Sequence, residues 1–271
     1  MSVRLSVLTV LLSVVLVLAG LWVGSNVNLL PIDASANAPV YDELFRVLFS
    51  IGTMLFMGVV GLLIYSLIRY RRIDGDMGDG AAIEGNLPLE IVWTAIPAVV
   101  VLFVGLYSYN IYERMGGMTP LVDHSSMHAM AEMGSDTEGK VWGGISTTPG
   151  ATAAVSVDVT AMQFAFIFRY PASNIISGEL HVPEGEVVEL RMQANDVIHA
   201  FWVPQFRLKQ DIIPGQPTVL TFTPSRAGTY PIICAELCGP YHGGMRSSVV
   251  VHERDAFDEW IAKNTPPAVA S

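Results

Sequence analysis

Three long apolar stretches lie in the first half of the chain, separated by short polar segments. They cover residues 5–23, 44–68 and 89–109. A helix needs about 20 consecutive apolar residues to cross a bilayer, so the second and third stretches predict a two-span transmembrane hairpin over residues 41–112. Pro97 lies within the third stretch, where it would kink the helix or mark the end of its first turns.

The first apolar stretch has two interpretations. Arg4, the apolar run and the small pair Ala19-Gly20 are typical of a secretory signal peptide. The alternative is an uncleaved N-terminal membrane anchor. Residues 1–24 are therefore expected to be a signal peptide or a third membrane helix.

Basic residues set the predicted orientation of the spans. Arg69, Arg71 and Arg72 crowd the end of the second stretch, and the positive-inside rule places the loop over residues 70–87 in the cytoplasm. Everything after about residue 112 then lies outside the cytoplasm. Both cysteines fall in that external part, where a disulfide is chemically possible.

From residue 151 onward the apolar stretches give way to short segments of alternating apolar and polar residues. Residues 154–160 alternate as a half-buried strand does, and turn signals such as Pro214-Gly215 separate the later segments. Many short strands predict an antiparallel sandwich or barrel over residues 151–265, closed by a helix over residues 255–263. The further expected strands cover residues 163–170, 179–182, 187–193, 199–203, 217–223, 228–234 and 247–252.

Two polar segments read as linkers. Residues 25–40 carry small residues and prolines and are expected to form an external linker. Residues 113–150 contain His124, His128 and five methionines, and thioether and imidazole groups together hold Cu(I) weakly. This Met/His-containing linker either captures copper or is a flexible connector. The five methionines are Met115, Met118, Met127, Met130 and Met133.

Composition narrows the class of protein. Hydrophobic residues make up 51% of the 271 residues and charged residues only 15%, which favours a membrane protein with room for one soluble domain. The net charge of -10 argues against nucleic acid as a partner. An acidic external domain suits a basic protein partner met by electrostatic steering, although acidity also keeps a domain soluble.

The only two cysteines, Cys234 and Cys238, share one loop with His242 and Met245. Thiolate, imidazole and thioether groups are soft or borderline ligands that suit copper, whereas Met is a poor zinc ligand. A disulfide between the cysteines is the alternative. A type-1 copper site uses one Cys, two His and a weak axial ligand, so a second Cys allows both sulfurs to bridge two copper ions.

A binuclear centre needs one imidazole and one weak ligand for each copper. His199, at the edge of an earlier expected strand, and His242 supply the imidazoles. Met245 supplies one weak ligand, and a backbone carbonyl between the cysteines, such as that of Glu236, could supply the other.

The cysteine loop and the His199 segment resemble the copper A domain of cytochrome c oxidase subunit II, in the haem–copper oxidase family. The two-span anchor before a cupredoxin-like sandwich matches too, so the resemblance covers about residues 40–264. It implies a binuclear mixed-valence centre. One copper would take His199 and Met245, and the other His242 and the main-chain oxygen of Glu236. Cys234 and Cys238 would bridge them.

The resemblance also implies roles outside the copper centre. The Glu236 side chain would help hold magnesium or manganese at the interface with subunit I. Glu90, at the cytoplasmic mouth of the third apolar stretch, matches the family carboxylate at the entrance of a proton-uptake path. The alternative for Glu90 is an interfacial residue held among lipid headgroups.

One departure from the family pattern concerns the electron route. The family commonly has a Gln-Trp-Tyr-Trp run whose first Trp admits electrons from cytochrome c. Here the run is Gln163-Phe164-Ala165-Phe166, so Phe164 is the candidate for electron input. A similar substitution appears in cyanobacterial-type subunits, and the donor is either a small soluble cytochrome c or a plastocyanin-like protein.

The implied function is that of subunit II of a terminal cytochrome c oxidase, a multi-pass protein of a bacterial inner or thylakoid membrane. The copper domain would lie on the periplasmic or lumenal side. Electrons from a soluble donor would pass through copper A to haem in subunit I, with subunit III as a further partner. Oxygen would be reduced to water there, coupled to proton translocation, so the oxygen chemistry lies in another subunit.

Other protein classes are weighed against this function. A membrane-tethered copper carrier is the main alternative, and the Met/His linker favours it. A quinol oxidase subunit II lacks the copper ligands present here, and the absence of Cys-x-x-Cys-His excludes a fused c-type haem. His181 and His252 are expected to be ordinary sandwich residues, since nothing in the sequence pairs with them.

Overall fold

The computed structural model describes residues 3–71, 75, 78, 85–117, 142–146 and 153–267. The chain divides into two compact units. One comprises residues 1–30 and 42–110, and the other residues 31–41 and 111–271.

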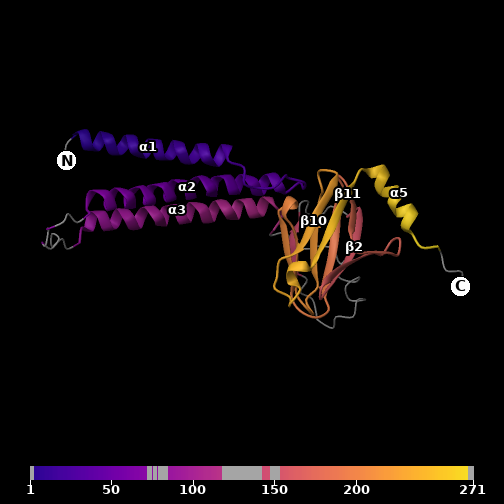
Figure 1. Ribbon diagram of the computed structural model, residues 1–271. Coiled ribbons are helices and arrows are strands. Elements are labelled where there is room, and N and C mark those ends of the chain that lie inside the picture. Colours follow the sequence, from indigo (N-terminus) through magenta and orange to yellow (C-terminus); the bar gives the residue numbers. More distant parts are fainter. Residues whose placement is uncertain are drawn as a thin grey trace. The chain divides into compact units, whose positions relative to one another are not determined.

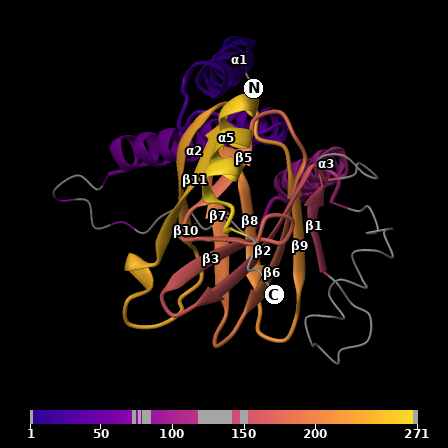
Figure 2. The ribbon, with the colours of Figure 1, turned by 90° about the vertical axis from the view of Figure 1, so that its right-hand side faces the viewer.

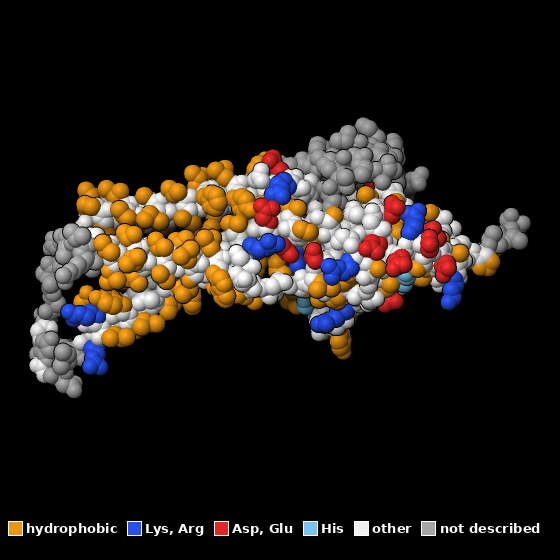
Figure 3. Space-filling view, turned by 90° about the horizontal axis from the view of Figure 1, so that it is seen from above, with side chains coloured by type: hydrophobic (Ala, Val, Ile, Leu, Met, Phe, Trp, Pro, Cys, Tyr) orange, Lys and Arg blue, Asp and Glu red, His pale blue; other side chains and the backbone are white. Residues whose placement is uncertain are grey.

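The first unit is built from three long helices (Figure 1). They are α1 (Val3–Asn26), α2 (Ala38–Arg69) and α3 (Leu87–Arg114). Each is long and apolar enough to cross a membrane, and Figure 3 shows apolar side chains covering their outer faces. The three expected apolar helices are confirmed, and α3 continues through Pro97.

Small residues bring α1 and α2 together. Gly20 faces Met54, and Gly24 faces Ser50, so closely that neither glycine leaves room for a side chain. Close approach at small residues four positions apart is how helices commonly pack inside a membrane. Between the other two helices, the Tyr107 hydroxyl of α3 donates a hydrogen bond of 3.0 Å to Glu43 Oε1 of α2.

The second unit is a sandwich of two β-sheets (Figures 1 and 2). The six-stranded sheet has the order β1-β9-β6-β2-β3-β4 and the five-stranded sheet the order β5-β11-β10-β7-β8. The helix α5 (Arg254–Asn264) follows the last strand. The strands are β1 (Trp142–Ser146), β2 (Val155–Met162), β3 (Ala165–Tyr170), β4 (Ile175–Ser177), β5 (Leu180–Pro183), β6 (Val188–Ala194), β7 (His199–Val203), β8 (Leu208–Ile212), β9 (Thr218–Phe222), β10 (Gly228–Cys234) and β11 (Arg246–His252).

The expected sandwich is confirmed, but the expectation of purely antiparallel sheets is wrong. Three strand pairs are parallel, namely β1 with β9, β2 with β6, and β5 with β11. Alternation of apolar and polar residues reports which face of a strand is buried and carries no information on the direction of its neighbour. The sequence patterns also missed β1, β4 and β8. β4 has only three residues, and β8 carries charged residues on its outer face.

The core lies between the two sheets. Alternate residues of β2, β6 and β10 are buried, and Phe168, Phe201, Phe206 and Phe222 are fully buried. Each such side chain stabilises the fold by roughly 1.5–3 kcal/mol relative to exposure. This packed core gives the loops at the ends of the strands a rigid base.

The segment expected as an external linker over residues 25–40 is partly packed onto the sandwich. Ala34 N–H donates to Gln205 O at 3.0 Å, Ala36 N–H donates to Thr223 O at 3.0 Å, and the Ser35 hydroxyl donates to Phe206 O at 2.8 Å. Ala34 and Ser35 are buried. A free linker is therefore the wrong description of residues 34–36. Most of the Met/His linker lies outside the described residues.

Candidate metal centre

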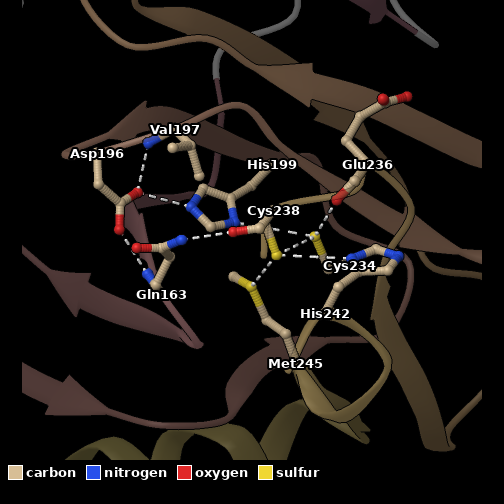
Figure 4. Close-up of polar contacts among 9 residues, drawn as sticks. All are labelled: Gln163, Asp196, Val197, His199, Cys234, Glu236, Cys238, His242 and Met245. Atoms are coloured by element: carbon tan, nitrogen blue, oxygen red, sulfur yellow. Dashed lines mark hydrogen bonds and ion pairs between the residues drawn. The ribbon is translucent and has the colours of Figure 1, made fainter. Parts of the chain in front are cut away.

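The predicted ligands come together at one end of the sandwich, on two neighbouring strands (Figure 4). Cys234 is the last residue of β10 and His199 the first of β7, and these strands pair with Cys234 opposite Phe201. The loop from β10 to β11 carries the other predicted ligands, and the 3-10 turn η2 (His242–Gly244) shapes its end. The sheet thus fixes two ligands, and one loop supplies the rest.

The donor atoms lie in mutual contact. The two sulfurs, Cys234 Sγ and Cys238 Sγ, are 3.9 Å apart. His199 Nδ1 is 3.9 Å from Cys234 Sγ, and His242 Nδ1 is 3.5 Å from Cys238 Sγ. Met245 Sδ is 3.8 Å from Cys238 Sγ, and the Cys234 thiol donates to the main-chain oxygen of Glu236 at 3.3 Å. All six predicted ligands are therefore brought together.

These distances fit a metal site and exclude a disulfide in this structure. Both cysteines are free thiols, and their sulfurs are far beyond the S–S bond length of about 2.05 Å. A metal–thiolate bond is about 2.3 Å long, so two sulfurs 3.9 Å apart can contact the same ion. His199, Cys234 and Cys238 form a buried group of possible metal ligands.

Burial disfavours ionised thiolates at this site unless a metal ion is bound. His199 and Met245 have no exposed surface, and each cysteine exposes 3%. Burial, followed by the proximity of Cys234, raises the pKa of the Cys238 thiol to about 11. A bound cation would supply the positive charge that the two thiolates need.

The loop is closed by its own backbone. Cys234 N–H donates to Met245 O at 3.1 Å, and Met245 N–H donates to His242 O at 3.1 Å. Gly239 has φ of +135°, a conformation that favours glycine. A Cβ at Gly239 would also lie 2.8 Å from Gln163 Nε2, so a side chain here would strain the backbone and displace Gln163.

Asp196 and Gln163 support the predicted ligands His199 and Cys238 through hydrogen bonds. Neither was predicted as a site residue. Asp196 Oδ1 is 2.8 Å from His199 Nε2, which leaves the lone pair of His199 Nδ1 for the metal. Gln163 N–H donates to Asp196 Oδ2 at 2.7 Å, and Gln163 Nε2 donates to Cys238 O at 2.6 Å. The only sequence signal was a carboxylate three residues before His199.

The charge of Asp196 is stabilised by these contacts. Partial burial raises its pKa, but the hydrogen bonds from His199 and from the backbone N–H groups of Gln163 and Val197 outweigh burial and lower the pKa to about 2. Asp196 is therefore ionised at neutral pH. An ionised acceptor orients His199 and strengthens its ring as a metal ligand.

Phe164 lies next to the ligand loop. Its ring packs edge-on against Tyr241, with centroids 5.5 Å apart and planes at 74°. A Cβ at Gly239 would lie 3.2 Å from two atoms of the Phe164 ring. The predicted position of Phe164 beside the site is thus what the structure has, while its role in electron input is untested.

The Glu236 side chain points away from the sulfurs (Figure 4). Lys209 Nζ of β8 donates to Glu236 Oε1 at 2.8 Å and to Asp211 Oδ1 at 2.9 Å. Hydrogen bonds to Glu236 and Asp211 raise the pKa of Lys209. The carboxylate expected to hold magnesium or manganese is therefore paired with an ammonium group in this chain.

Glu90 belongs to the helical unit and caps α3 locally. Its Oε1 accepts a hydrogen bond of 2.9 Å from Asn86 N–H, while Asn86 Oδ1 accepts from Leu89 N–H at 3.2 Å. This reciprocal arrangement satisfies donors at the start of the helix. The structure thus gives Glu90 a capping role, and its role in proton uptake stays a prediction.

His181 and His252 do have a partner, namely each other, which corrects the expectation from the sequence. His181 Nδ1 and His252 Nε2 are 2.8 Å apart, and Trp260 of α5 stacks on His181 with ring centroids 4.1 Å apart. The two histidines lie on the parallel strands β5 and β11. Burial, followed by the proximity of His252, lowers the pKa of His181 to about 4.

Fold and site together define a membrane-anchored protein whose β-sandwich carries a group of His and Cys residues that could hold a metal ion. Residues 20–111 match the family "Cytochrome C oxidase subunit II, transmembrane domain". Residues 172–253 match the family "Cytochrome C oxidase subunit II, periplasmic domain". The chain belongs to the cytochrome c oxidase subunit II family. It is a component of an oxidoreductase complex, with its C-terminal domain outside the cytoplasm.

Two relatives cover nearly the whole chain. A cytochrome c oxidase subunit 2 from Thermostichus vulcanus is 48% identical over 98% of this chain and 87% of its own length. The subunit 2 from Synechocystis is 44% identical over 98% of this chain and 85% of its own length. Both support the resemblance to cyanobacterial-type subunits. Among solved structures, the chain is similar to the periplasmic domain of cytochrome oxidase subunit II from Bradyrhizobium japonicum. The two sequences are 27% identical, and the match covers 42% of this chain and 95% of the Bradyrhizobium chain, with a TM-score of 0.40.

Proposed function

We propose that this chain holds a binuclear copper A centre, accepts single electrons there from a soluble donor, and passes them to haem in subunit I. The observation that carries the proposal is the convergence of two free thiols, two imidazoles, a thioether and a carbonyl oxygen at one end of the sandwich. Hard ions such as magnesium prefer oxygen ligands, so this soft set favours copper.

Each terminal ligand lies against one of the two bridging sulfurs. Cys234 and Cys238 would bridge the two coppers. His199 and Met245 would complete the ligand set of one copper ion. His242 and the Glu236 carbonyl oxygen would complete the ligand set of the other. When bound, the copper pair supplies a reversible one-electron carrier.

The protein's own part is to keep these ligands still. Asp196 and Gln163 tie His199 and the Cys238 carbonyl to neighbouring loops, and Cys234 is anchored in β10. Ligands that barely move between oxidation states allow fast electron transfer. The closed backbone of the loop and the buried Met245 serve the same end.

The partners follow from the family. We infer that the chain assembles with subunits I and III, and that a soluble cytochrome c or a plastocyanin-like protein donates the electrons. Oxygen reduction and proton translocation would then take place outside this chain. Glu90 is kept as a candidate for the entrance of the proton-uptake path, in addition to its capping contact.

A magnesium or manganese ion at Glu236 finds less support in this chain. Lys209 already holds Glu236 Oε1, and its positive charge opposes a cation at that oxygen. Such an ion would need further oxygen ligands from another subunit. No step of the proposed function depends on it.

Copper stoichiometry tests the proposal. The purified full chain, loaded with copper and freed of excess, is expected to hold two copper ions, and Cys238→Ser is expected to hold at most one. His252→Gln serves as the control, because His252 lies outside the site and pairs with His181. Two coppers retained by the Cys238→Ser variant would refute the bridging role of the thiolates.

A further inference from the structure

Tyr241 is the residue before the predicted ligand His242, yet 72% of its surface is exposed. Its hydroxyl makes no hydrogen bond within the described part of the chain, and its ring contact there is with Phe164. A large aromatic side chain held at the surface is costly in water and is typical of protein-binding hot spots.

Other exposed apolar side chains gather on the segments that carry the ligands. Among the described residues of the sandwich, the exposed large hydrophobic side chains are those of Val197, Ile198, Trp202, Leu237 and Tyr241, with Ile176 elsewhere. Val197 and Ile198 directly precede His199, and Leu237 lies between the cysteines. Ile176 is on β4, opposite Arg169 towards the other end of β3. Exposed apolar surface is therefore concentrated around the metal centre.

A continuous series of contacts joins Tyr241 to the ligands. The Tyr241 ring meets the Phe164 ring at a centroid distance of 5.5 Å. The Phe164 ring in turn lies against Gly239, which directly follows Cys238. Through the backbone, Tyr241 is bonded to His242, whose Nδ1 is 3.5 Å from Cys238 Sγ. Phe164 is only partly exposed, so the outer end of this series is Tyr241.

Building on the proposed function, we propose that Tyr241 is the residue on which the electron donor docks and through whose ring its electron passes. The donor is a soluble one-electron metalloprotein with an apolar surface around its cofactor. The donor's metal is oxidised and the copper centre held by Cys238 and His242 is reduced. No bond forms or breaks, and no proton moves. Phe164 acts as a positioning residue, because its ring holds Tyr241 in place.

The test uses the full copper-loaded chain and two substitutions at one position. Tyr241→Leu keeps apolar bulk and removes the ring, whereas Tyr241→Phe keeps the ring and removes the hydroxyl. Ile176→Ala is the matched control, because it removes another exposed apolar side chain (71% exposed) away from the centre. Stopped-flow absorption measures reduction of the copper centre by a reduced soluble c-type cytochrome and, separately, by hexaammineruthenium(II).

The second-order rate constant with the cytochrome is expected to fall about tenfold or more in Tyr241→Leu, as for loss of an aromatic hot spot. It should stay near wild type in Tyr241→Phe and in Ile176→Ala. Reduction by the ruthenium complex, which needs no docking surface, should change less than about twofold in every variant, with unchanged copper content.

Three results would overturn the proposal. They are a wild-type rate with the cytochrome in Tyr241→Leu, a loss in Tyr241→Phe as large as that in Tyr241→Leu, or a loss of copper in Tyr241→Leu. Failure of the proposed function itself looks different, because wild-type protein would then be reduced by neither reductant.

Discussion

The proposed ligand His199 is oriented by Asp196, a residue outside the proposed ligand set. Asp196 Oδ1 lies 2.8 Å from His199 Nε2 and is held by backbone N–H groups on both of its oxygens. The imidazole is therefore fixed in one orientation and in the tautomer that presents Nδ1 to the sulfurs. Residues that orient a ligand in this way typically contribute 10–100-fold to metal affinity.

Removing this support should weaken copper binding without removing a ligand. Asp196→Ala is expected to lower copper affinity by about 10–100-fold, and Asp196→Asn, which keeps an acceptor oxygen, to lower it less. Competition against a chelator of known affinity measures the effect. Equal affinity in Asp196→Ala and wild type would show that the position of His199 is set by β7 alone.

At this scale the sequence indicated which candidate ligand residues meet in the fold far better than it indicated the residues that support them. Cys234, Cys238, His242 and Met245 share one loop, so their spacing alone indicated a metal site. Asp196 and Gln163 act through hydrogen bonds between loops, and only the folded backbone sets such partners. His181 and His252 are 71 residues apart, and the parallel pairing of β5 with β11 that joins them has no mark in the sequence.

At the scale of elements, α5 is attached to the sandwich through aromatic and histidine rings. Trp260 stacks on His181 and packs against Tyr170, at centroid distances of 4.1 Å and 5.2 Å. Burial lowers the pKa of both His181 and His252, and the proximity of His252 lowers that of His181 further, to about 4. Glu179 acts on His181 in the opposite direction. The folded state therefore favours the neutral pair.

This attachment should make stability depend on pH. The unfolded chain takes up protons near the ordinary histidine pKa of about 6.5, whereas folded His181 does so only near 4. The folded state then binds fewer protons between these values, and stability falls as the pH drops from about 6.5 to 4.

The expected loss, allowing for partial exposure, is on the order of 1–2 kcal/mol. Thermal unfolding of the full chain at several pH values measures it, with Trp fluorescence as one probe. His181→Gln should flatten the dependence over this range, although it also breaks the pair. An unchanged slope in that variant would assign the pH dependence to other groups.

Substitutions at the contact between α1 and α2 would distinguish a retained membrane anchor from a cleaved signal peptide. Gly24→Leu would force a side chain into Ser50 and should destabilise the helical unit by about 1–3 kcal/mol. Gly61→Leu is the control, because nothing lies within 4 Å of a Cβ at that position. Thermal stability of the purified protein in detergent is the measurement. No difference between the two variants would indicate that α1 is absent from the mature protein.

The sequence predicted the positions of most strands, but it did not predict the order and direction of the strands in each sheet. The expected strands over residues 199–203 and 228–234 coincide with β7 and β10, because both are apolar runs bounded by turn residues. The order and direction of strands depend on which connections cross between the sheets. Residues 34–36 (Ala-Ser-Ala) form no apolar run that would mark their docking on the sandwich, which depends on hydrogen bonds to distant segments.

On the scale of the whole molecule, the membrane helices and the sandwich differ in the chemistry of their surfaces. Figure 3 shows apolar side chains over the helices and both acidic and basic side chains over the sandwich. The apolar surface suits the lipid, and the net charge of -10 of the whole chain favours a positively charged partner in the water phase. The candidate metal centre lies in the sandwich, which is the domain outside the cytoplasm.

The proposed function requires that this chain carry a one-electron centre made of two copper ions. Anaerobic titration of the copper-loaded full chain with a calibrated reductant, followed by absorption and electron paramagnetic resonance, tests it most directly. The colour and the signal of two coppers are expected to disappear together after one electron per chain. A colourless chain that holds a single Cu(I) and takes up no electron would contradict a binuclear electron-transfer centre and would identify a copper carrier instead.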